Sequence, residues 1–395
     1  MRALSGRGKA TIVTAGAVTA VGTAVTLAAV FGTGASGPSA GARAGLDAST
    51  STPSGHGPSA RVVGRYTMPS GGEEPANLQG LAAAHGTAWV TGTEGPLGKA
   101  GSPTGIVLRY QGGRLTRLNA PLAQGHSEGG DVAATGGRAW VLASERDSAT
   151  LLSTDGQAWR RDARPSHGGV DTYGIAAVGD RDMWIVGTKP GARGAKDVPV
   201  LLHYDGSAWR RTDKGVGGDG GLDLFGITAR ASNDVWVAGE RSLNGKNETA
   251  TPFFAHWDGH AWHRQGAPAR LGYVRSVAPL TSANAWAVGG SGCACSSAAG
   301  PLVLHYDGRS WRRAAATGLQ HSLDSVVQDG HGGLWATEDG GRLVHFDGHR
   351  WTPAALPDQA AATAVARDAQ TGKTYAIAAE PEQNAKVTAL LLELN

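Results

Sequence analysis

The amino-acid sequence predicts an all-β chain in which seven blades of four antiparallel strands form a closed ring, a seven-bladed β-propeller. Three observations support this. An apolar strand centred on an aromatic residue recurs every 40 to 52 residues. A second apolar run follows most copies and ends in an Asp-Gly pair, with a Trp three residues later. A lone strand-like segment, 61–67, precedes the first complete repeat.

The aromatic strand is predicted to be the second strand of each blade. Its seven copies are Ala88-Trp89-Val90, Ala139-Trp140-Val141, Met183-Trp184-Ile185, Val235-Trp236-Val237, Ala285-Trp286-Ala287, Leu334-Trp335-Ala336 and Thr374-Tyr375-Ala376. Each flat blade must bury both faces against its neighbours, and one large ring per strand fills that wedge. We therefore expect these rings to be core rather than a platform on which carbohydrate stacks.

The Asp-Gly pairs are predicted to turn the third strand of a blade into the fourth. Between two apolar runs the pair favours a two-residue hairpin, because both central residues of such a turn must accept positive φ. The copies are Asp155-Gly156, Asp205-Gly206, Asp258-Gly259, Asp307-Gly308 and Asp347-Gly348. Blade one departs from this pattern, with Tyr110-Gln111-Gly112-Gly113.

A further short strand precedes the aromatic strand and is predicted to be the inner one, as at 173–177, 225–229, 275–279 and 324–328. The count gives seven first, second and third strands but only six fourth strands, because the last third strand, 387–394, ends the chain. The segment 61–67 is expected to complete blade seven and so remove an exposed sheet edge. The predicted propeller spans residues 60–395.

The first 59 residues are predicted to be targeting and linker sequence. Residues 1–42 contain a basic stretch, an uncharged run of 22 residues from Ala10 to Phe31 and a small-x-small site at 40–42. They are predicted to be a signal peptide or a signal anchor, since the run is long enough to span a bilayer. Residues 43–59, rich in Gly, Ser and Pro, are predicted to be a disordered linker. We expect a secreted, or alternatively membrane-anchored, extracellular protein, and the composition is typical of a bacterial genome of high GC content.

The charge balance excludes a nucleic-acid partner. The formal charge is +3, but three basic residues lie in the first 42 residues, leaving 33 Lys and Arg against 33 Asp and Glu. A clustered basic face is therefore not expected. No phosphate-binding loop, dinucleotide fingerprint or nucleophile elbow is present, so no cofactor is predicted and an enzyme is the less favoured interpretation.

The two cysteines, Cys293 and Cys295, lie in one segment of blade five. In an exported chain such a pair favours a disulfide. Free thiols or a metal or redox role remain alternatives, but nothing supplies the other ligands of a zinc site.

The repeat resembles the kelch-type propeller family. Blade five matches it best, through Trp286-Ala287-Val288-Gly289-Gly290, Tyr306-Asp307 and Trp311, and other blades keep one Gly of the pair, as at Val186-Gly187 and Ala238-Gly239. A fainter likeness, at 153–159, is to Asp-box propellers. The resemblance covers residues 60–395 and implies a monomeric propeller scaffold.

The kelch-type family that the repeat resembles includes copper radical oxidases such as galactose oxidase. Their metal site needs two His and two Tyr, and one Tyr is crosslinked to a Cys. Four histidines occupy equivalent repeat positions here: His203, His256, His305 and His345. Rotational equivalence spreads them around the ring, so we predict structural histidines and no metal.

Binding residues are expected where the copies disagree. The residues 11 and 13 positions before the second-strand aromatic differ between blades and are predicted to lie at the mouth of the central channel: Asp171, Tyr173, Asp223, Phe225, Tyr273, Arg275 and Asp324. Long segments between second and third strands, at 92–105, 189–198, 241–251 and 290–300, are expected on the same face.

The leading functional hypothesis is a binding or scaffold module that recognises an extracellular protein or glycan through these residues and segments. The alternative is a propeller enzyme, a hydrolase or lyase with carboxylates at the channel mouth.

Overall fold

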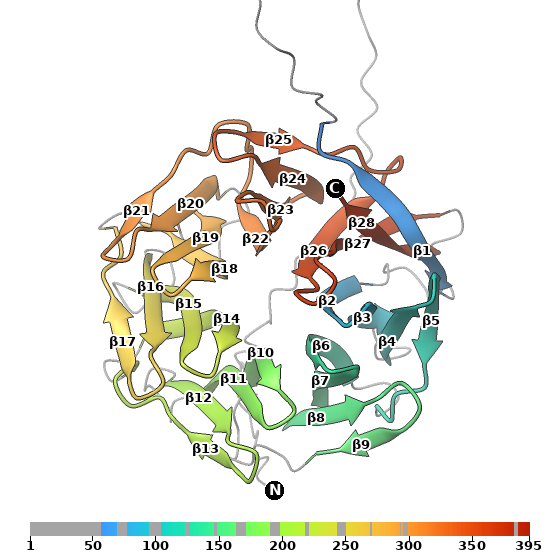
Figure 1. Cartoon of the computed structure of the whole chain (residues 1–395), viewed down its shortest axis with the longest axis horizontal. Coiled ribbons are helices and arrows are strands. Elements are labelled where there is room, and N and C mark those ends of the chain that lie inside the picture. The colour runs from blue at the N-terminus through green and yellow to red at the C-terminus, as the bar shows by residue number, and fades with distance from the viewer. Residues whose placement is uncertain are drawn as a thin grey trace, which may run out of the picture.

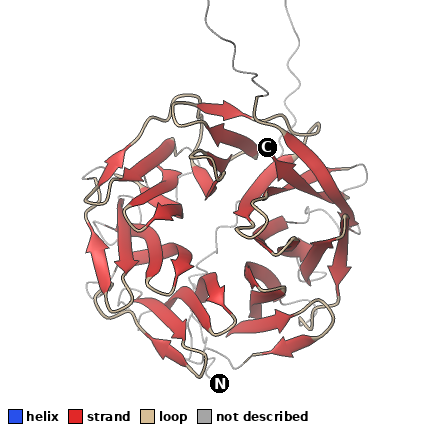
Figure 2. Ribbon diagram, in the orientation of Figure 1, coloured by secondary structure: helices blue, strands red, loops and turns tan. Residues whose placement is uncertain are grey.

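The structure is a computed structural model of the chain. It describes residues 57–68, 77–94, 104–122, 127–145, 148–162, 171–189, 198–217, 221–242, 250–268, 271–292, 294, 299–382 and 386–395. Within these residues the regular structure consists of strands, which form seven blades around a central axis (Figures 1 and 2). The predicted signal, the linker up to residue 56 and both cysteines lie outside the described residues.

Each blade has four antiparallel strands, in sequence order from the axis outward. Blade one contains β2 (Asn77–Ala84), β3 (Thr87–Glu94), β4 (Thr104–Gln111) and β5 (Arg114–Leu118). Blade two contains β6 (Ser127–Thr135), β7 (Arg138–Glu145), β8 (Ser148–Thr154) and β9 (Trp159–Arg161). Blade three contains β10 (Asp171–Gly179), β11 (Asp182–Lys189), β12 (Val198–Tyr204) and β13 (Trp209–Arg211).

Blades four to six repeat the arrangement. Blade four contains β14 (Leu222–Ala231), β15 (Asp234–Ser242), β16 (Ala250–Trp257) and β17 (Trp262–Gln265). Blade five contains β18 (Tyr273–Thr281), β19 (Asn284–Gly290), β20 (Pro301–Tyr306) and β21 (Trp311–Arg313). Blade six contains β22 (Leu323–Gln328), β23 (Leu334–Glu338), β24 (Arg342–Phe346) and β25 (Trp351–Pro353).

Blade seven is built from both ends of the described chain, which confirms the predicted closure. It contains β26 (Ala361–Arg367), β27 (Thr374–Pro381), β28 (Val387–Leu394) and, outermost, β1 (Ala60–Met68). The β1–β28 pairing is antiparallel and runs from Ala60 opposite Leu394 to Met68 opposite Val387. Ser59 and Asn395 extend it with two backbone hydrogen bonds of 3.1 and 3.0 Å.

The core lies between neighbouring blades, as expected for the repeated aromatic residues. Trp89, Trp184 and Trp236 are fully buried. Trp184 of blade three packs with blade four, where its ring meets Trp262 edge-on at 5.7 Å between centroids. Trp236 meets Trp311 of blade five at 5.8 Å in the same way. Each second-strand aromatic therefore joins one blade to the next.

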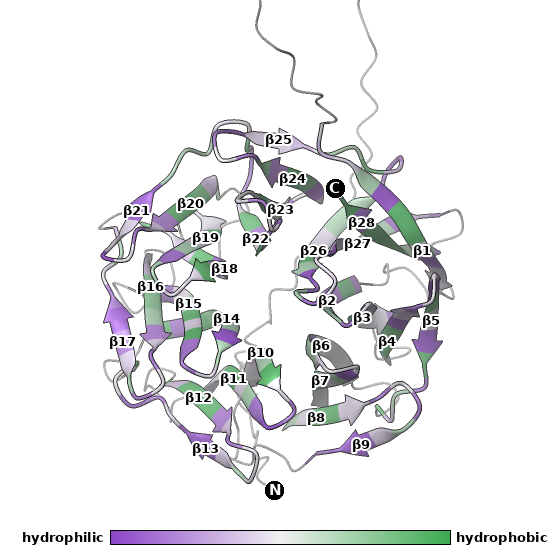
Figure 3. Ribbon diagram, in the orientation of Figure 1, coloured by the Kyte–Doolittle hydropathy of each residue, from purple (hydrophilic) through white to green (hydrophobic). Residues whose placement is uncertain are grey.

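Apart from β1, the outermost strands have three to five residues, and they line the circumference (Figure 3). β9, β13 and β21 are three residues long and share the sequence Trp-Arg-Arg. Short, charged edge strands discourage the pairing of one sheet with another chain.

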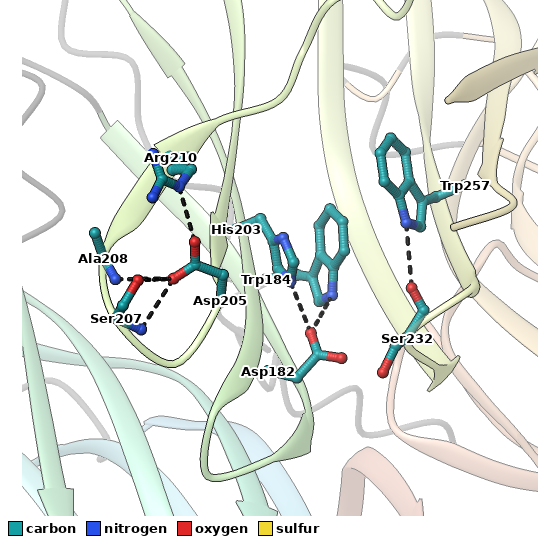
Figure 4. Close-up of polar contacts among 9 residues, drawn as sticks. All are labelled: Asp182, Trp184, His203, Asp205, Ser207, Ala208, Arg210, Ser232 and Trp257. Carbon is teal, nitrogen blue, oxygen red and sulfur yellow. Dashed lines mark hydrogen bonds and ion pairs between the residues drawn. The ribbon is translucent and has the colours of Figure 1, made fainter. Parts of the chain in front are cut away.

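The Asp-Gly turns differ from the predicted two-residue hairpins. In blade three the last paired residues are Tyr204 and Trp209, so four residues form the loop, and of these only Gly206 has positive φ, at 87°. The Asp205 carboxylate explains the longer loop, because its Oδ1 accepts hydrogen bonds from the backbone N–H groups of Ser207 and Ala208, each at 2.9 Å. Arg210 Nε donates to its other oxygen at 2.8 Å (Figure 4).

A second repeated unit, near the same end of the blades, engages the histidines. Asp182 Oδ1 lies 3.0 Å from Trp184 Nε1, which donates to it, and 2.9 Å from His203 Nε2 (Figure 4). The His203 ring stacks on Trp184 at 3.9 Å between centroids. One carboxylate thus satisfies the indole N–H and fixes the imidazole.

All four predicted structural histidines take this place in their own blades. The other partners of the imidazole Nε2 are Asp234 for His256 at 2.8 Å, Asn284 for His305 at 2.9 Å and Asp329 for His345 at 2.9 Å. The prediction that these residues are distributed around the ring is confirmed.

Blade five provides a test, because Asn284 replaces the carboxylate found in blades three, four and six. Burial lowers the pKa of His305 below its usual value. The folded chain therefore binds this proton less readily than the unfolded chain and loses stability as the pH falls below about 6.5. In the Asn284→Asp variant a carboxylate raises the pKa of His305, so this loss should shrink by about 1 kcal/mol between pH 8 and pH 5, measured by denaturant unfolding.

The matched control for this test is Asp182→Asn, which removes the charge from the equivalent pair in blade three. This variant should lose more unfolding free energy between pH 8 and pH 5 than wild type does. If the unfolding free energy of Asn284→Asp follows the wild-type pH dependence, residue 284 does not control the protonation of His305.

The second prediction concerns closure. Deletion of residues 60–68 exposes the edge of β28 and should lower the melting temperature sharply, because blade seven loses its outermost strand. Deletion of residues 1–56, which keeps β1, is the control. A synthetic peptide of residues 60–68 should restore the melting temperature by pairing with β28. Melting curves that coincide for the two deletions would rule the closure model out.

Candidate functional site

Every inner strand contains a β-bulge at the same place, close to its first residue. In each one the register against the second strand skips a residue, so that one extra residue has no partner across the ladder. In blade four, Leu224 pairs with Gly239 and Gly226 with Ala238, which leaves Phe225 as the extra residue. The bulged residues of six blades are Gln79, Tyr173, Phe225, Arg275, Asp324 and Thr363, and in blade two Gly130 and Asp131 both stand opposite the single residue Leu142.

The bulges explain the glycine that follows the aromatic residue of the second strand. A Cβ on Gly239 would lie 1.9 Å from the carbonyl oxygen of Asp223, and one on Gly289 would lie 2.1 Å from that of Tyr273. These carbonyls belong to the residues two positions before the bulge. In these two blades the bent inner strand thus approaches the second strand too closely for a side chain at this position. The equivalent residues in blades two, six and seven are Ala143, Glu338 and Ala378.

Side chains beside the bulges link neighbouring inner strands. Asp131 Oδ2 accepts a hydrogen bond from the backbone N–H of Ile175 in the next blade at 3.0 Å, and its Oδ1 accepts one from Val132 at 2.8 Å. Burial raises the pKa of Asp131 to about 6 in spite of these bonds. Ser276 receives an equivalent bond from Val326, at 3.3 Å. Asp131 is therefore a structural member of the ring.

The bulges lie on the face where inner strands begin and second strands end, which we call the bulge face. The Asp-Gly turns and the Asp-Trp-His units lie toward the opposite end of the strands, which we call the turn face. The repeated hydrogen-bonding units therefore lie at one face, and the residues that differ between blades lie at the other.

The structure brings the predicted site residues onto the bulge face. Four of them, Tyr173, Phe225, Arg275 and Asp324, are the bulged residues of blades three to six. Asp223 and Tyr273 precede their bulges by two residues, in regular register. Asp171 occupies the same place in β10, where its backbone pairs with Thr188, and its side chain lies outside what the structure describes.

Arg275 is the centre of the best-defined group. Its guanidinium carbon lies 4.8 Å from the centroid of the Phe225 ring and 5.2 Å from that of Tyr273. Cation–π contact holds the positive charge against two aromatic faces, one on blade four and one on its own blade. Arg275 thereby connects the bulges of two neighbouring blades.

Two carboxylates close to Arg275 have unusual pKa values. Burial raises the pKa of Glu240 to about 7, helped by the negative charge of Asp223, its partner across the ladder. Burial also raises the pKa of Asp324 to about 6, helped by the charge of Asp339. Arg275 lowers both pKa values, so its positive charge acts on both carboxylates. Raised carboxylate pKa values cluster at functional sites.

Tyr273 links this group to blade six. Burial raises the pKa of its hydroxyl, opposed by a hydrogen bond with the Ser322 side chain and by the charge of Arg275. Asp324 and Asp339 both raise the pKa of Tyr273, so they face it from blade six. The group is thus formed by blades four, five and six.

Sequence comparison missed Asp131, Thr363, Glu240 and Asp339. Asp131 lies at the bulge of blade two and Thr363 is the bulged residue of blade seven, but the strand spacing in these blades differs from the spacing of 11 used to find the others. Glu240 belongs to the second strand β15, and Asp339 directly follows the second strand β23. The glycine next to Glu240, Gly239, marks where a second strand meets a bulge and is the signal that could have found it.

Other predictions fall outside this group. Cys293 and Cys295 lie outside the described residues, as do most residues of the four long segments expected on this face. Within the described part of the chain, no three His, Cys, Asp or Glu side chains are grouped as metal ligands would be. Nor do the described residues form a helix of the length and apolarity that crossing a membrane requires.

No protein-family model matches the sequence, and no curated protein does. Solved structures share the fold. YCF48 bound to D1 peptide matches with a TM-score of 0.54 and 10% identity, over 82% of this chain and 95% of that one. A virginiamycin B lyase from Staphylococcus aureus matches with 0.54 and 10%, over 82% and 98%. The acylaminoacyl peptidase of Pyrococcus horikoshii matches with 0.54 and 10%, over 81% of this chain and 51% of that one.

At these identities the likeness shows a shared propeller architecture. The kelch-type resemblance therefore rests on the repeat residues alone. The neighbours include a protein that binds a peptide and proteins named as enzymes.

The dependence of the bulge on glycine can be tested at position 239. Gly239→Ala forces the second strand away from the Asp223 carbonyl and should reduce the unfolding free energy by about 1–3 kcal/mol, measured by urea denaturation. Gly266→Ala is the control, because nothing lies within 4 Å of a Cβ at that position. Equal stability of the two variants would show that the inner strand has room for a side chain.

Proposed function

We propose that this chain is an exported binding module that holds a segment of an extracellular protein at the bulge face. One observation carries the proposal. Seven blades place their bulges at the same point, and the bulged residues of six of them are a mixture of amide, carboxylate, aromatic, guanidinium and hydroxyl groups. A scaffold that repeats its framework and varies one residue per blade is suited to recognising one specific ligand.

A protein ligand is favoured over a glycan for two reasons. The faces of Phe225 and Tyr273 that a sugar ring would need are partly covered by Arg275. In addition, two large hydrophobic side chains stand out as exposed in the described residues: Val198, at 39%, is the first residue of β12, and Leu271, at 45%, lies two residues before β18, both toward the bulge face. Apolar side chains around a polar centre suit the surface of a protein partner.

The solved structures that share this fold support a protein ligand only through their common architecture. A propeller with the same architecture is described as bound to a peptide. The export of this chain, which its N-terminal sequence predicts, would place the bulge face in the cell wall or the medium, where the partner is to be sought.

A second candidate is a hydrolase or lyase, and the raised pKa values of Asp324 and Glu240 favour it. A carboxyl group with a pKa near 6 or 7 can exchange a proton at neutral pH. Turnover of any peptide or glycan substrate that is lost in Asp324→Asn would favour this candidate over a binding module.

The proposal is tested by selecting ligands from a random dodecapeptide library with the immobilised full chain. Selected peptides are titrated calorimetrically against wild type and Arg275→Ala, which removes the group connecting blades four and five. Arg210→Ala, an exposed arginine of the turn face, is the control. We expect the dissociation constant to rise at least tenfold, about 1.4 kcal/mol, in Arg275→Ala and to stay unchanged in the control.

Peptides that bind both variants equally well, or a library that yields no binder, would count against the proposal. A glycan array screened with the same variants tests carbohydrate ligands. Glycan binding that is lost in Arg275→Ala and kept in Arg210→Ala would identify the ligand as a carbohydrate and not a protein segment.

A further inference from the structure

Three bulged residues have buried polar atoms that form no hydrogen bond among the described residues. These atoms are Oε1 of Gln79, Nε of Arg275 and Oγ1 of Thr363. Buried polar atoms in native proteins nearly always have partners, and these three are among twelve such unpartnered atoms in the described part of the chain. Arg275 and Thr363 belong to the blades on either side of Asp324. Two of the three unpartnered atoms at the bulges therefore flank blade six.

The charges around this part of the ring are unbalanced. Blade four contributes Asp223 and Glu240, and blade six contributes Asp324 and Asp339, whereas blade five between them contributes Arg275. The guanidinium of Arg275 already faces the rings of Phe225 and Tyr273. Arg241, the next residue after Glu240, faces the Phe253 ring at 5.7 Å and is turned to its own blade.

The four carboxylates differ in how well a ligand could reach them. Glu240 is only 2% exposed and accepts a hydrogen bond from the backbone N–H of Ala294 at 3.1 Å. Asp223, Asp324 and Asp339 are half-buried, so their surfaces remain partly open. Asp339 Oδ1 accepts a hydrogen bond from Gly340 N–H at 2.9 Å. Two of the three partly open carboxylates therefore belong to blade six.

Burial makes Asp324 and Glu240 costly to ionise, and the positive charge of Arg275 does not offset that cost. The charged groups that act on Asp324 are Arg275 and Asp339, and those that act on Glu240 are Asp223 and Arg275. A cation placed beside Asp324 stabilises its ionised form, whereas an anion opposes it.

From this geometry we propose that the protein segment held at the bulge face carries a basic side chain, Lys or Arg, whose positive charge lies beside Asp324 and Asp339. The inference rests on the proposed function and specifies its ligand. The unpartnered Nε of Arg275 and Oγ1 of Thr363 lie in the flanking blades, where peptide carbonyl and N–H groups of the same segment can satisfy them.

The test uses the full chain and three capped probes: octalysine, octaglutamate and an uncharged Gly-Ser octapeptide. Octalysine should bind wild type, measured by calorimetry at low ionic strength, and the other two should not. The single variants Asp324→Asn and Asp339→Asn should each weaken octalysine binding at least threefold, and the double variant at least tenfold. Asp358→Asn, an exposed carboxylate between β25 and β26 on the same face, is the matched control and should bind as wild type does.

The pH dependence is a second measurement. Octalysine binding by wild type should strengthen between pH 5 and pH 8, because Asp324 loses its proton near pH 6 and presents a full negative charge above it. The dependence should be weaker in Asp324→Asn. Each variant is first melted at pH 7, and a variant that does not melt cooperatively is replaced by its single-site partner.

Octaglutamate binding, or octalysine binding that Asp358→Asn weakens as much as the double variant does, would overturn the inference. The library selection separates this outcome from failure of the proposed function. Selected peptides that require Arg275 but contain no Lys or Arg would refute only the inference of a basic side chain. A library that yields no peptide whose binding depends on Arg275 would refute both this inference and the proposed function.

Discussion

The pairing of β1 with β28 is the constraint on which the rest of the molecule depends. Each blade buries its second-strand aromatic against the next blade, so an open ring would leave one such surface without a neighbour. Eight residues at one end of the chain are paired with residues at the other end, and the two termini are thereby held at one blade. Every inner strand then has two neighbours, and the seven bulges are fixed relative to one another.

The two faces of the ring use polar groups in opposite ways. Toward the turn face, carboxylates such as Asp182 and Asp205 are saturated by indole, imidazole and backbone donors from their own blade. At the bulge face, Asp324 and Glu240 remain costly to ionise, and atoms of Gln79, Arg275 and Thr363 have no hydrogen-bond partner in the part of the chain that the structure describes. Groups that reduce stability and yet lie together are better explained by binding than by folding.

The repeat in the sequence was sufficient to predict the blades, the closing strand and the core role of the Trp residues, because each depends on local pattern and on a strand count. The turn geometry was predicted wrongly. The Asp side chain, and not the backbone alone, completes the loop after Tyr204, and a rule based on φ angles cannot include that carboxylate. Four of the bulged residues were found through variation at a fixed spacing. The bulges of blades one, two and seven lie off that spacing, so Thr363 and the neighbouring Asp131 were missed, and Glu240 and Asp339 were missed because contacts across strands leave no periodic trace.

A bulged residue is an insertion that the ladder does not use, and this separates what the ring recognises from how it folds. A substitution at Gln79, Tyr173 or Thr363 leaves the pairing of the flanking residues and the register of the blade unchanged. Such positions can diverge in evolution without a compensating change elsewhere, and they can be randomised together in a library built on one fixed scaffold. The ring is therefore a natural starting point for engineering new binding specificities, one residue per blade.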